Sequence, residues 1–156
     1  MKIEIVSVSS ASELWFTEAI SVYKKKISYL MDFEVVHLKP NKGHRKVSAE
    51  KRVADSDILL SYIKPTDFLV ICDEKGKVFT SLVFSKKLES ILSSGSKRIL
   101  FMIGGPYGFS DEIKGKANLM LSLSSLTLNH WLAEVVMAEQ IYRALAIQNN
   151  LPYHNE

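Results

Sequence analysis

The chain has little cysteine, with Cys72 alone, and no long hydrophobic run. A single cysteine excludes an internal disulfide and a zinc site built from several cysteines. No apolar run reaches the roughly 20 residues that span a bilayer. The opening MKIEIVSV alternates as a strand does and contains Glu4, which argues against a secretory signal. These absences predict a cytoplasmic protein that does not span a membrane.

Several sequence signatures of common chemistries are missing as well. The chain has no G-x-x-x-x-G-K-[ST], which excludes a P-loop nucleotidase, and no G-x-G-x-x-G after its first strand, where a dinucleotide fold carries it. It also lacks G-x-S-x-G and H-E-x-x-H, which removes the corresponding serine and zinc hydrolases. No metal-ligand spacing relates the four histidines: His37, His44, His130 and His154. We therefore expect no metal.

Composition is that of an ordinary globular protein. The 156 residues, 47% hydrophobic and 24% charged, fit one domain over residues 1–156.

The net charge of +3 is unevenly spread, because residues 39–52 carry six Lys and Arg against one acid, and Lys24–Lys26 form a second cluster. Such clusters suit a phosphate backbone. A solvated basic surface explains them equally well, so the charge permits an RNA partner without requiring one.

Strand and helix patterns alternate along the chain. Strands are expected at residues 2–8, 33–38, 68–72, 98–103 and 119–123. Helices are expected at residues 12–30, 47–63, 81–92, 110–116 and 130–149. Ser12 is the expected N-cap of the first helix, Thr80 or Ser81 that of the third, and residues 73–77 form a turn centred on Gly76. This alternation predicts an α/β fold with a mostly parallel sheet and helices on both faces.

Three predicted loops follow strands, at residues 72–77, 104–108 and 123–128. The carboxyl ends of parallel strands share one edge of a sheet, so these loops should converge there, where α/β proteins bind ligands. The glycines of the second loop allow a ligand to approach the backbone closely. Because no lysine lies in that loop, the site suits a neutral, flat group such as adenine better than a triphosphate.

The last predicted helix is apolar around most of its circumference, which indicates burial on more than one side. A subunit interface is a natural second side, so a homodimer is expected. Glu139 and Arg143 have the i,i+4 spacing of a charge pair. Beyond the helix, Tyr153 and His154 are either a frayed end or two hydrogen-bonding rings that close over a site, where His154 could move a proton.

The motifs together resemble a known family. They are the MKI start, residues 73–77, the I-G-G-P-x-G loop at 103–108, S-L-S-x-L-T-L-x-H at 122–130, A-E-x-x-Y-R-A at 138–144 and P-Y-H at 152–154. The chain resembles the small SPOUT-class methyltransferases, which methylate N3 of a pseudouridine in bacterial large-subunit ribosomal RNA. Length and order agree from end to end.

This resemblance implies a C-terminal trefoil (α/β) knot, S-adenosylmethionine as cofactor, an obligate homodimer, and 23S ribosomal RNA in the ribosome as substrate. The cofactor positions are Cys72, Gly104, Leu123, Ser124, Ser125, Leu126, Thr127 and Leu128. Methylating N3 requires a base or a cation, because the nitrogen becomes nucleophilic as its proton leaves. The expected catalytic residues are His154, Tyr153 and Arg143, with His130 as a further possibility and no metal.

Two positions depart from the family pattern near the last helix. Asn129 replaces a proline, which removes a rigid turn, and Glu134 replaces an arginine, which reverses a charge near the expected RNA-facing or interface region. The reversal favours an alternative, a non-catalytic ribosome-binding module with the same fold. A SPOUT methyltransferase that acts on transfer RNA is a further alternative.

Overall fold

The computed structural model describes residues 1–10, 12–41 and 47–155, so the predicted basic loop lies partly outside the described residues. The strands are β1 (Lys2–Val8), β2 (Asp32–Leu38), β3 (Asp67–Val78), β4 (Arg98–Ile103) and β5 (Leu119–Ser122). The helices are α1 (Leu14–Ser28), α2 (Ser48–Tyr62), α3 (Ser81–Leu92), α4 (Asp111–Lys116) and α5 (His130–Gln148).

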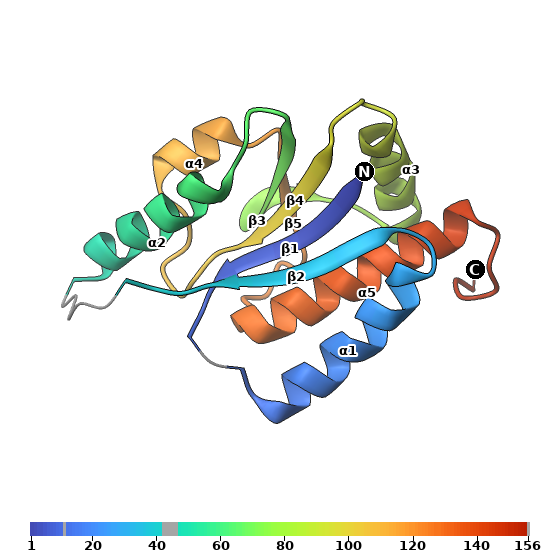
Figure 1. Cartoon of the computed structure of the whole chain (residues 1–156), viewed down its shortest axis with the longest axis horizontal. Helices are drawn as coiled ribbons and strands as arrows, with labels where there is room; N and C mark the ends of the chain where they lie inside the picture. The colour runs from blue at the N-terminus through green and yellow to red at the C-terminus, as the bar shows by residue number, and fades with distance from the viewer. Residues whose placement is uncertain (11, 42–46, 156) are drawn as a thin grey trace.

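Within the described residues the strands form one sheet in the order β2-β1-β4-β3-β5 (Figure 1). Each neighbouring pair in it is parallel. Parallel strands need long connections, which the helices between them supply. The predicted α/β fold with a parallel sheet is confirmed.

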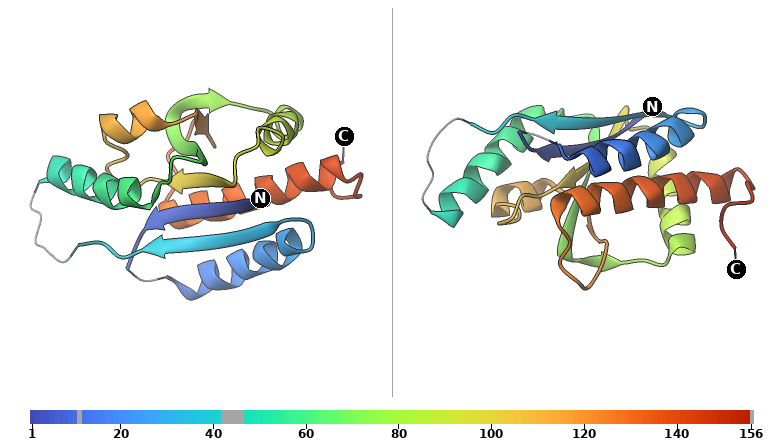
Figure 2. Two further views of the ribbon diagram at one scale, coloured as in Figure 1. Left: turned by 45° about the horizontal axis from the view of Figure 1, so that its top comes forward. Right: turned by 90° about the horizontal axis from the view of Figure 1, so that it is seen from below.

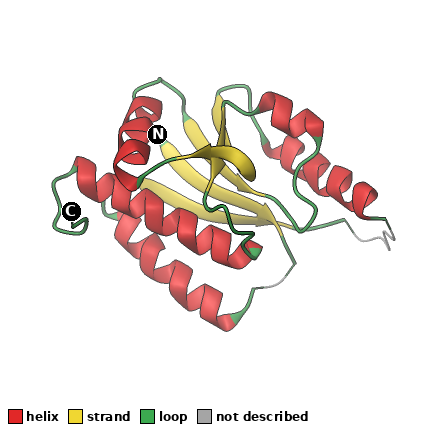
Figure 3. Ribbon diagram, turned by 180° about the vertical axis from the view of Figure 1, so that it is seen from behind, coloured by secondary structure: helices red, strands yellow, loops and turns green. Residues whose placement is uncertain are grey.

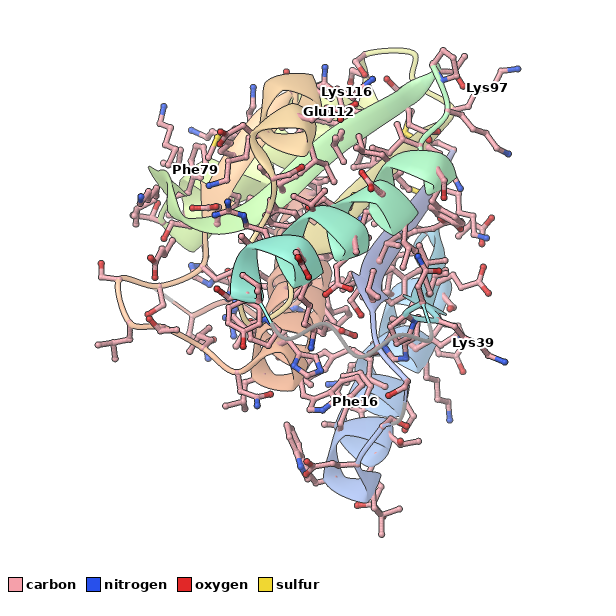
Figure 4. All side chains as sticks on the ribbon, turned by 90° about the vertical axis from the view of Figure 1, so that its left-hand side faces the viewer. Phe16, Lys39, Phe79, Lys97, Glu112 and Lys116 are labelled. Carbon is pink, nitrogen blue, oxygen red and sulfur yellow. The ribbon has the colours of Figure 1, made fainter. Side chains whose placement is uncertain are left out.

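Helices cover both faces of the sheet because the strands are apolar on both sides. Along β1, Ile5 packs in one core with α1, α3 and α5, whereas Val6 packs in a second core with α2 and α4. Figure 4 shows α4, with Glu112 and Lys116, and α1, with Phe16, on opposite sides of the strands. The predicted helices on both faces are therefore confirmed.

The predicted turn at residues 73–77 is wrong, because β3 continues through it. After a register shift between Cys72 and Lys77, Lys77 pairs with Leu121 of β5. Gly76 lies so close to β5 that a Cβ there would be 2.6 Å from the backbone carbon of Leu121. Glycine is present for this close approach of two backbones, and not for a turn.

One of the two predicted helix caps is correct. The side chain of Thr80 accepts a hydrogen bond from the backbone N–H of Val83 at 3.3 Å and caps α3. Ser12 does not cap α1, because the Glu13 carbonyl already accepts the first helical bond, from the N–H of Thr17. The helix therefore begins one residue too late for Ser12 to serve as its N-cap.

Most of the apolar surface of α5 is covered within the chain. The helix packs between α1 and α3 against the sheet (Figure 3). Its side chains Met137, Ala138 and Ile141 have no exposed surface, while Leu132 is 46% exposed. The apolar circumference of this helix therefore does not by itself require a second subunit. Within the described residues, no helix is long and apolar enough to cross a membrane.

Candidate active site

A cavity of about 480 Å³ lies at the carboxyl edge of the sheet, where residues 72–75 of β3 meet the loops after β4 and β5. Residues 72–75, 103–109 and 123–128 contribute to its walls, with Ser125 excepted. The predicted convergence of these three segments is thus confirmed, although the first of them lies within β3 and not in a loop after it. The volume falls in the range of pockets that bind small ligands and cofactors. We call this cavity the cleft.

The cleft brings together all but one of the expected cofactor-binding residues. Those that line it are Cys72, Gly104, Leu123, Ser124, Leu126, Thr127 and Leu128. Ser125 is exposed and does not line it. The remaining wall includes Arg52 of α2 and Lys114 of α4. Arg52 belongs to the basic run at residues 39–52, whereas Lys114 carried no such signal, and nothing in either segment predicts that both reach the cleft from helices on one face of the sheet.

A tight turn shapes the glycine-rich wall. The Gly108 N–H donates to the Gly105 carbonyl at 3.0 Å, and Gly108 has φ +72°, a conformation that favours glycine. A Cβ on Gly104 would lie 3.1 Å from the buried ring of Phe109. Gly104 therefore presents backbone to the cleft while its other side packs on Phe109.

Polar contacts connect the loops around the cleft. The Asp73 carboxylate lies 3.0 Å from Lys114 Nζ and accepts a bond from the Lys75 N–H at 2.9 Å. Burial alone would raise the pKa of Asp73, but these two donors hold it below its usual value. The Thr127 hydroxyl donates to Glu74 at 3.3 Å and ties the last loop to the first. The cleft is thus fixed by contacts within the chain.

Cys72 forms part of the cleft wall as a thiol. Its Sγ lies 3.7 Å from Met137 Sδ on α5. Burial raises the pKa of this thiol to about 12, so it stays protonated at neutral pH. It therefore offers the cleft an uncharged surface rather than a nucleophile. His130 also lines the cleft, and burial lowers its pKa below the usual value.

The three expected catalytic residues lie together around Glu139, near the middle of α5, and none of them lines the cleft. Arg143 donates from Nε and Nη2 to Glu139 Oε1 at 3.0 and 2.5 Å, which confirms the predicted charge pair. The Tyr153 hydroxyl donates to the same oxygen at 3.1 Å. Arg143 Nη1 lies 3.2 Å from His154 Nδ1. We call these four residues the tail cluster.

A lysine of α1 holds the tail cluster in place. Lys26 Nζ lies 5.2 Å from the ring centroids of Tyr142 and Tyr153 and 5.8 Å from that of Tyr23. Such cation–π contacts favour a fixed arrangement of the rings. Burial and hydrogen bonding with Tyr23 raise the pKa of Tyr153, so this phenol keeps its proton. The two sequence segments are over a hundred residues apart, which is why neither predicts the contact.

The cleft and the tail cluster lie along different parts of α5. His130 and Ala133 of α5 line the cleft, and Arg143 is 10 residues beyond Ala133, about 15 Å at 1.5 Å per residue. Both views in Figure 2 show the C-terminus beyond the end of α5 that lies away from α2 and α4. One chain therefore does not bring the expected catalytic and cofactor-binding residues together.

The two departures from the family pattern change less than expected. Asn129 keeps a proline-like φ of −57°, and its side chain accepts a bond from the Trp131 N–H at 2.9 Å and caps α5. Glu134 has no exposed surface and lies 2.8 Å from His37 Nε2. Glu134 therefore puts no carboxylate on the exposed surface of a single chain, because its side chain is buried against His37. The charge reversal at Glu134 therefore no longer favours the alternative of a non-catalytic ribosome-binding module.

Among the described residues, no three His, Cys, Asp or Glu side chains lie close enough together to hold a metal ion.

A parallel α/β sheet with a preformed cleft at its carboxyl edge defines a class of proteins that bind small ligands or cofactors.

Residues 1–154 match the family model described as "Predicted SPOUT methyltransferase", and the chain belongs to this family. It is 41% identical over 155 residues to the ribosomal RNA large subunit methyltransferase H of Bdellovibrio bacteriovorus, with 99% of each chain covered. Proteins of the same name from Parabacteroides distasonis and Chromobacterium violaceum are 38% and 40% identical over 157 residues, with both chains covered in full. The resemblance seen in the sequence is confirmed.

Proposed function

We propose that this chain is a ribosomal RNA methyltransferase of the cytoplasm, which transfers a methyl group from S-adenosylmethionine to N3 of a pseudouridine in 23S ribosomal RNA within the ribosome. The observation that carries the proposal is the cleft, formed by residues 72–75 of β3 and the loops after β4 and β5 in a chain that matches its relatives over their full length. Those relatives are named ribosomal RNA large subunit methyltransferases.

The cleft fits the proposed cofactor in size and in chemistry. Its walls combine backbone and apolar groups, suited to adenine, with hydroxyls and the charged rim around Asp73 and Lys114 for polar groups. The residues that would hold the cofactor are Cys72, Gly104, Leu123, Ser124, Leu126, Thr127 and Leu128. S-adenosylmethionine supplies an electrophilic methyl group when bound. The protein's own part is to hold donor and target in line.

The separation of cleft and tail cluster supports a homodimer as the active form. None of Tyr153, His154 and Arg143 lines the cleft of its own chain, and Arg143 is about 15 Å along α5 from Ala133 in the cleft wall. In the proposed dimer the tail cluster of one protomer meets the cleft of its partner. The proposal also includes the C-terminal knot, which rests on the family resemblance.

Methyl transfer from radiolabelled S-adenosylmethionine tests the substrate. Purified protein is incubated in turn with whole ribosomes, free ribosomal RNA and transfer RNA. We expect label in the large-subunit RNA of ribosomes, at a pseudouridine when the RNA is digested. Label confined to transfer RNA would overturn the substrate assignment, and no binding of millimolar cofactor in calorimetry would overturn the enzymatic proposal.

Mixing two inactive variants tests the shared active site. His154→Ala damages the tail cluster, and Thr127→Arg fills the cleft from an exposed position without disturbing the core. Each alone should be inactive as a homodimer. A mixed dimer contains one undamaged pair of cleft and tail, so activity should return on mixing. A mixture no more active than its two components would rule out a site built from two chains.

A further inference from the structure

The contact between Arg143 and His154 determines which imidazole nitrogen carries the proton. A guanidinium has only N–H donors and stays protonated in proteins. Because Arg143 Nη1 lies 3.2 Å from His154 Nδ1, that nitrogen must accept the bond through its lone pair. The proton of the neutral ring is then on Nε2. An imidazolium would instead direct a second N–H against a permanent cation.

Glu139 fixes Arg143 in the orientation that makes this bond. Its Oε1 accepts from Nε and Nη2 of Arg143, which leaves Nη1 for the imidazole. The guanidinium carbon lies 4.7 Å from the ring centroid of Tyr153, which restricts it further. Glu139 is fixed in turn, because its Oε2 accepts from the Gln140 amide at 2.6 Å. Because this arrangement occupies Nδ1 of His154, Nε2–H is the group of the ring that can donate.

We propose that His154 donates its Nε2–H to a carbonyl oxygen of the target base, instead of removing the N3 proton, and that Glu139 is a positioning residue acting through Arg143. The inference rests on the proposed function, since His154 would meet the base in the partner's cleft. N3 of a pseudouridine lies between two carbonyl groups, and negative charge spreads to their oxygens as its proton leaves. A fixed donor at one oxygen stabilises that charge.

The atoms balance without His154 taking up a proton. The N3–H bond breaks and its proton passes to water. The electron pair left on N3 forms the bond to the methyl carbon, and the pair of the methyl–sulfur bond remains on sulfur. The Nε2–H of His154 is retained throughout, so the imidazole needs no reprotonation between turnovers.

The tautomer is measurable without substrate. In long-range ¹H–¹⁵N spectra of histidine-labelled protein at neutral pH, we expect the His154 signal, assigned from its loss in His154→Gln, to show a neutral ring protonated at Nε2. Arg143→Leu should shift the ring toward a mixture of tautomers. Glu139→Ala should act in the same direction, and Glu139→Gln, which keeps an acceptor for Arg143, should restore the wild-type signal. A wild-type ring protonated at Nδ1 or at both nitrogens would overturn the proposal.

Two substitutions then separate a donor from a base. His154→Gln places an amide N–H near the position of Nε2 but cannot take up a proton, whereas His154→Leu offers neither function. We expect His154→Leu to lower kcat by about 100-fold or more, the usual effect of losing such a donor, with KM little changed. His154→Gln should retain kcat within about tenfold of the wild type. Equal loss in both variants would refute the donor role, whereas a wild-type protein that methylates no RNA would refute the proposed function instead.

Discussion

Gly76→Ala should disturb the end of the sheet that carries the cleft. The added Cβ would lie 2.6 Å from the backbone carbon and 2.7 Å from the nitrogen of Leu121, and 2.7 Å from the backbone carbon of Met120. Real Cβ atoms do not approach backbone so closely, so β5 must move away from β3. Forcing extra atoms into a packed site costs about 1–3 kcal/mol. Because β5 leads into residues 123–128, the displacement should reach the cleft wall.

Thermal unfolding and cofactor calorimetry measure both effects. At about 2–4 °C per kcal/mol for a chain of this length, the midpoint should fall by about 2–12 °C. Affinity for S-adenosylmethionine should fall with it. Gly115→Ala is the matched control, because a Cβ on this α4 glycine would have no atom within 4 Å. It should leave stability unchanged or raise it by up to about 1 kcal/mol. A Gly76→Ala protein with the wild-type midpoint and affinity would refute the packing argument.

Three further predictions concern buried polar groups. The raised pKa of Cys72 should make its alkylation by iodoacetamide at pH 8 much slower than in the unfolded chain; equal rates would contradict its burial. Burial would raise the pKa of Asp67, but hydrogen bonds from Arg98 and the Lys64 N–H hold this pKa below its usual value. The ionised carboxylate therefore contributes its full stabilisation above about pH 4, and this stabilisation is lost as the pH falls through the lowered pKa. Asp67→Asn should therefore lower the free energy of unfolding by about 3 kcal/mol near neutral pH. On acidification the variant should lose less stability than the wild type, as denaturant titrations at neutral and acidic pH would show. Glu134→Gln should lower the free energy of unfolding by about 1–3 kcal/mol without changing RNA affinity, whereas weaker RNA binding in a filter assay would place this carboxylate on the RNA-facing surface after all.

The sheet and the cleft were predictable because their signals are local. Each strand is a short apolar run bounded by polar or turn residues, and the alternation with helices requires parallel pairing. Parallel pairing alone then puts residues 72–75, 103–109 and 123–128 at one edge. The position of the cleft followed from strand order in the sequence, before any side-chain contact was known.

The errors arose where a distant segment decides the local structure. The residues around Gly76 have the composition of a turn, but β3 pairs with β5 at this point, so Gly76 lies in a strand. Glu134 looked like a surface charge until His37, 97 residues away, was seen to pair with it. Lys26 and Tyr153 meet because α1 and α5 pack side by side. Neither composition nor periodicity contains such contacts.

The separation of the cleft and the tail cluster along α5 bears on how the proposed two-chain site would become active. Thr127 ties the cleft loops together, and Glu139, Arg143 and Lys26 fix the tail, so each half is already ordered within one chain. Association of two such chains would join preformed halves and would pay little additional conformational entropy at the site. The tail residues would then be aligned by contacts outside the cleft, which leaves the cleft wall free to fit the cofactor. A tail cluster that is ordered within one chain is therefore compatible with an active site that a second chain completes, and the contacts within the tail cluster directly support its order within one chain.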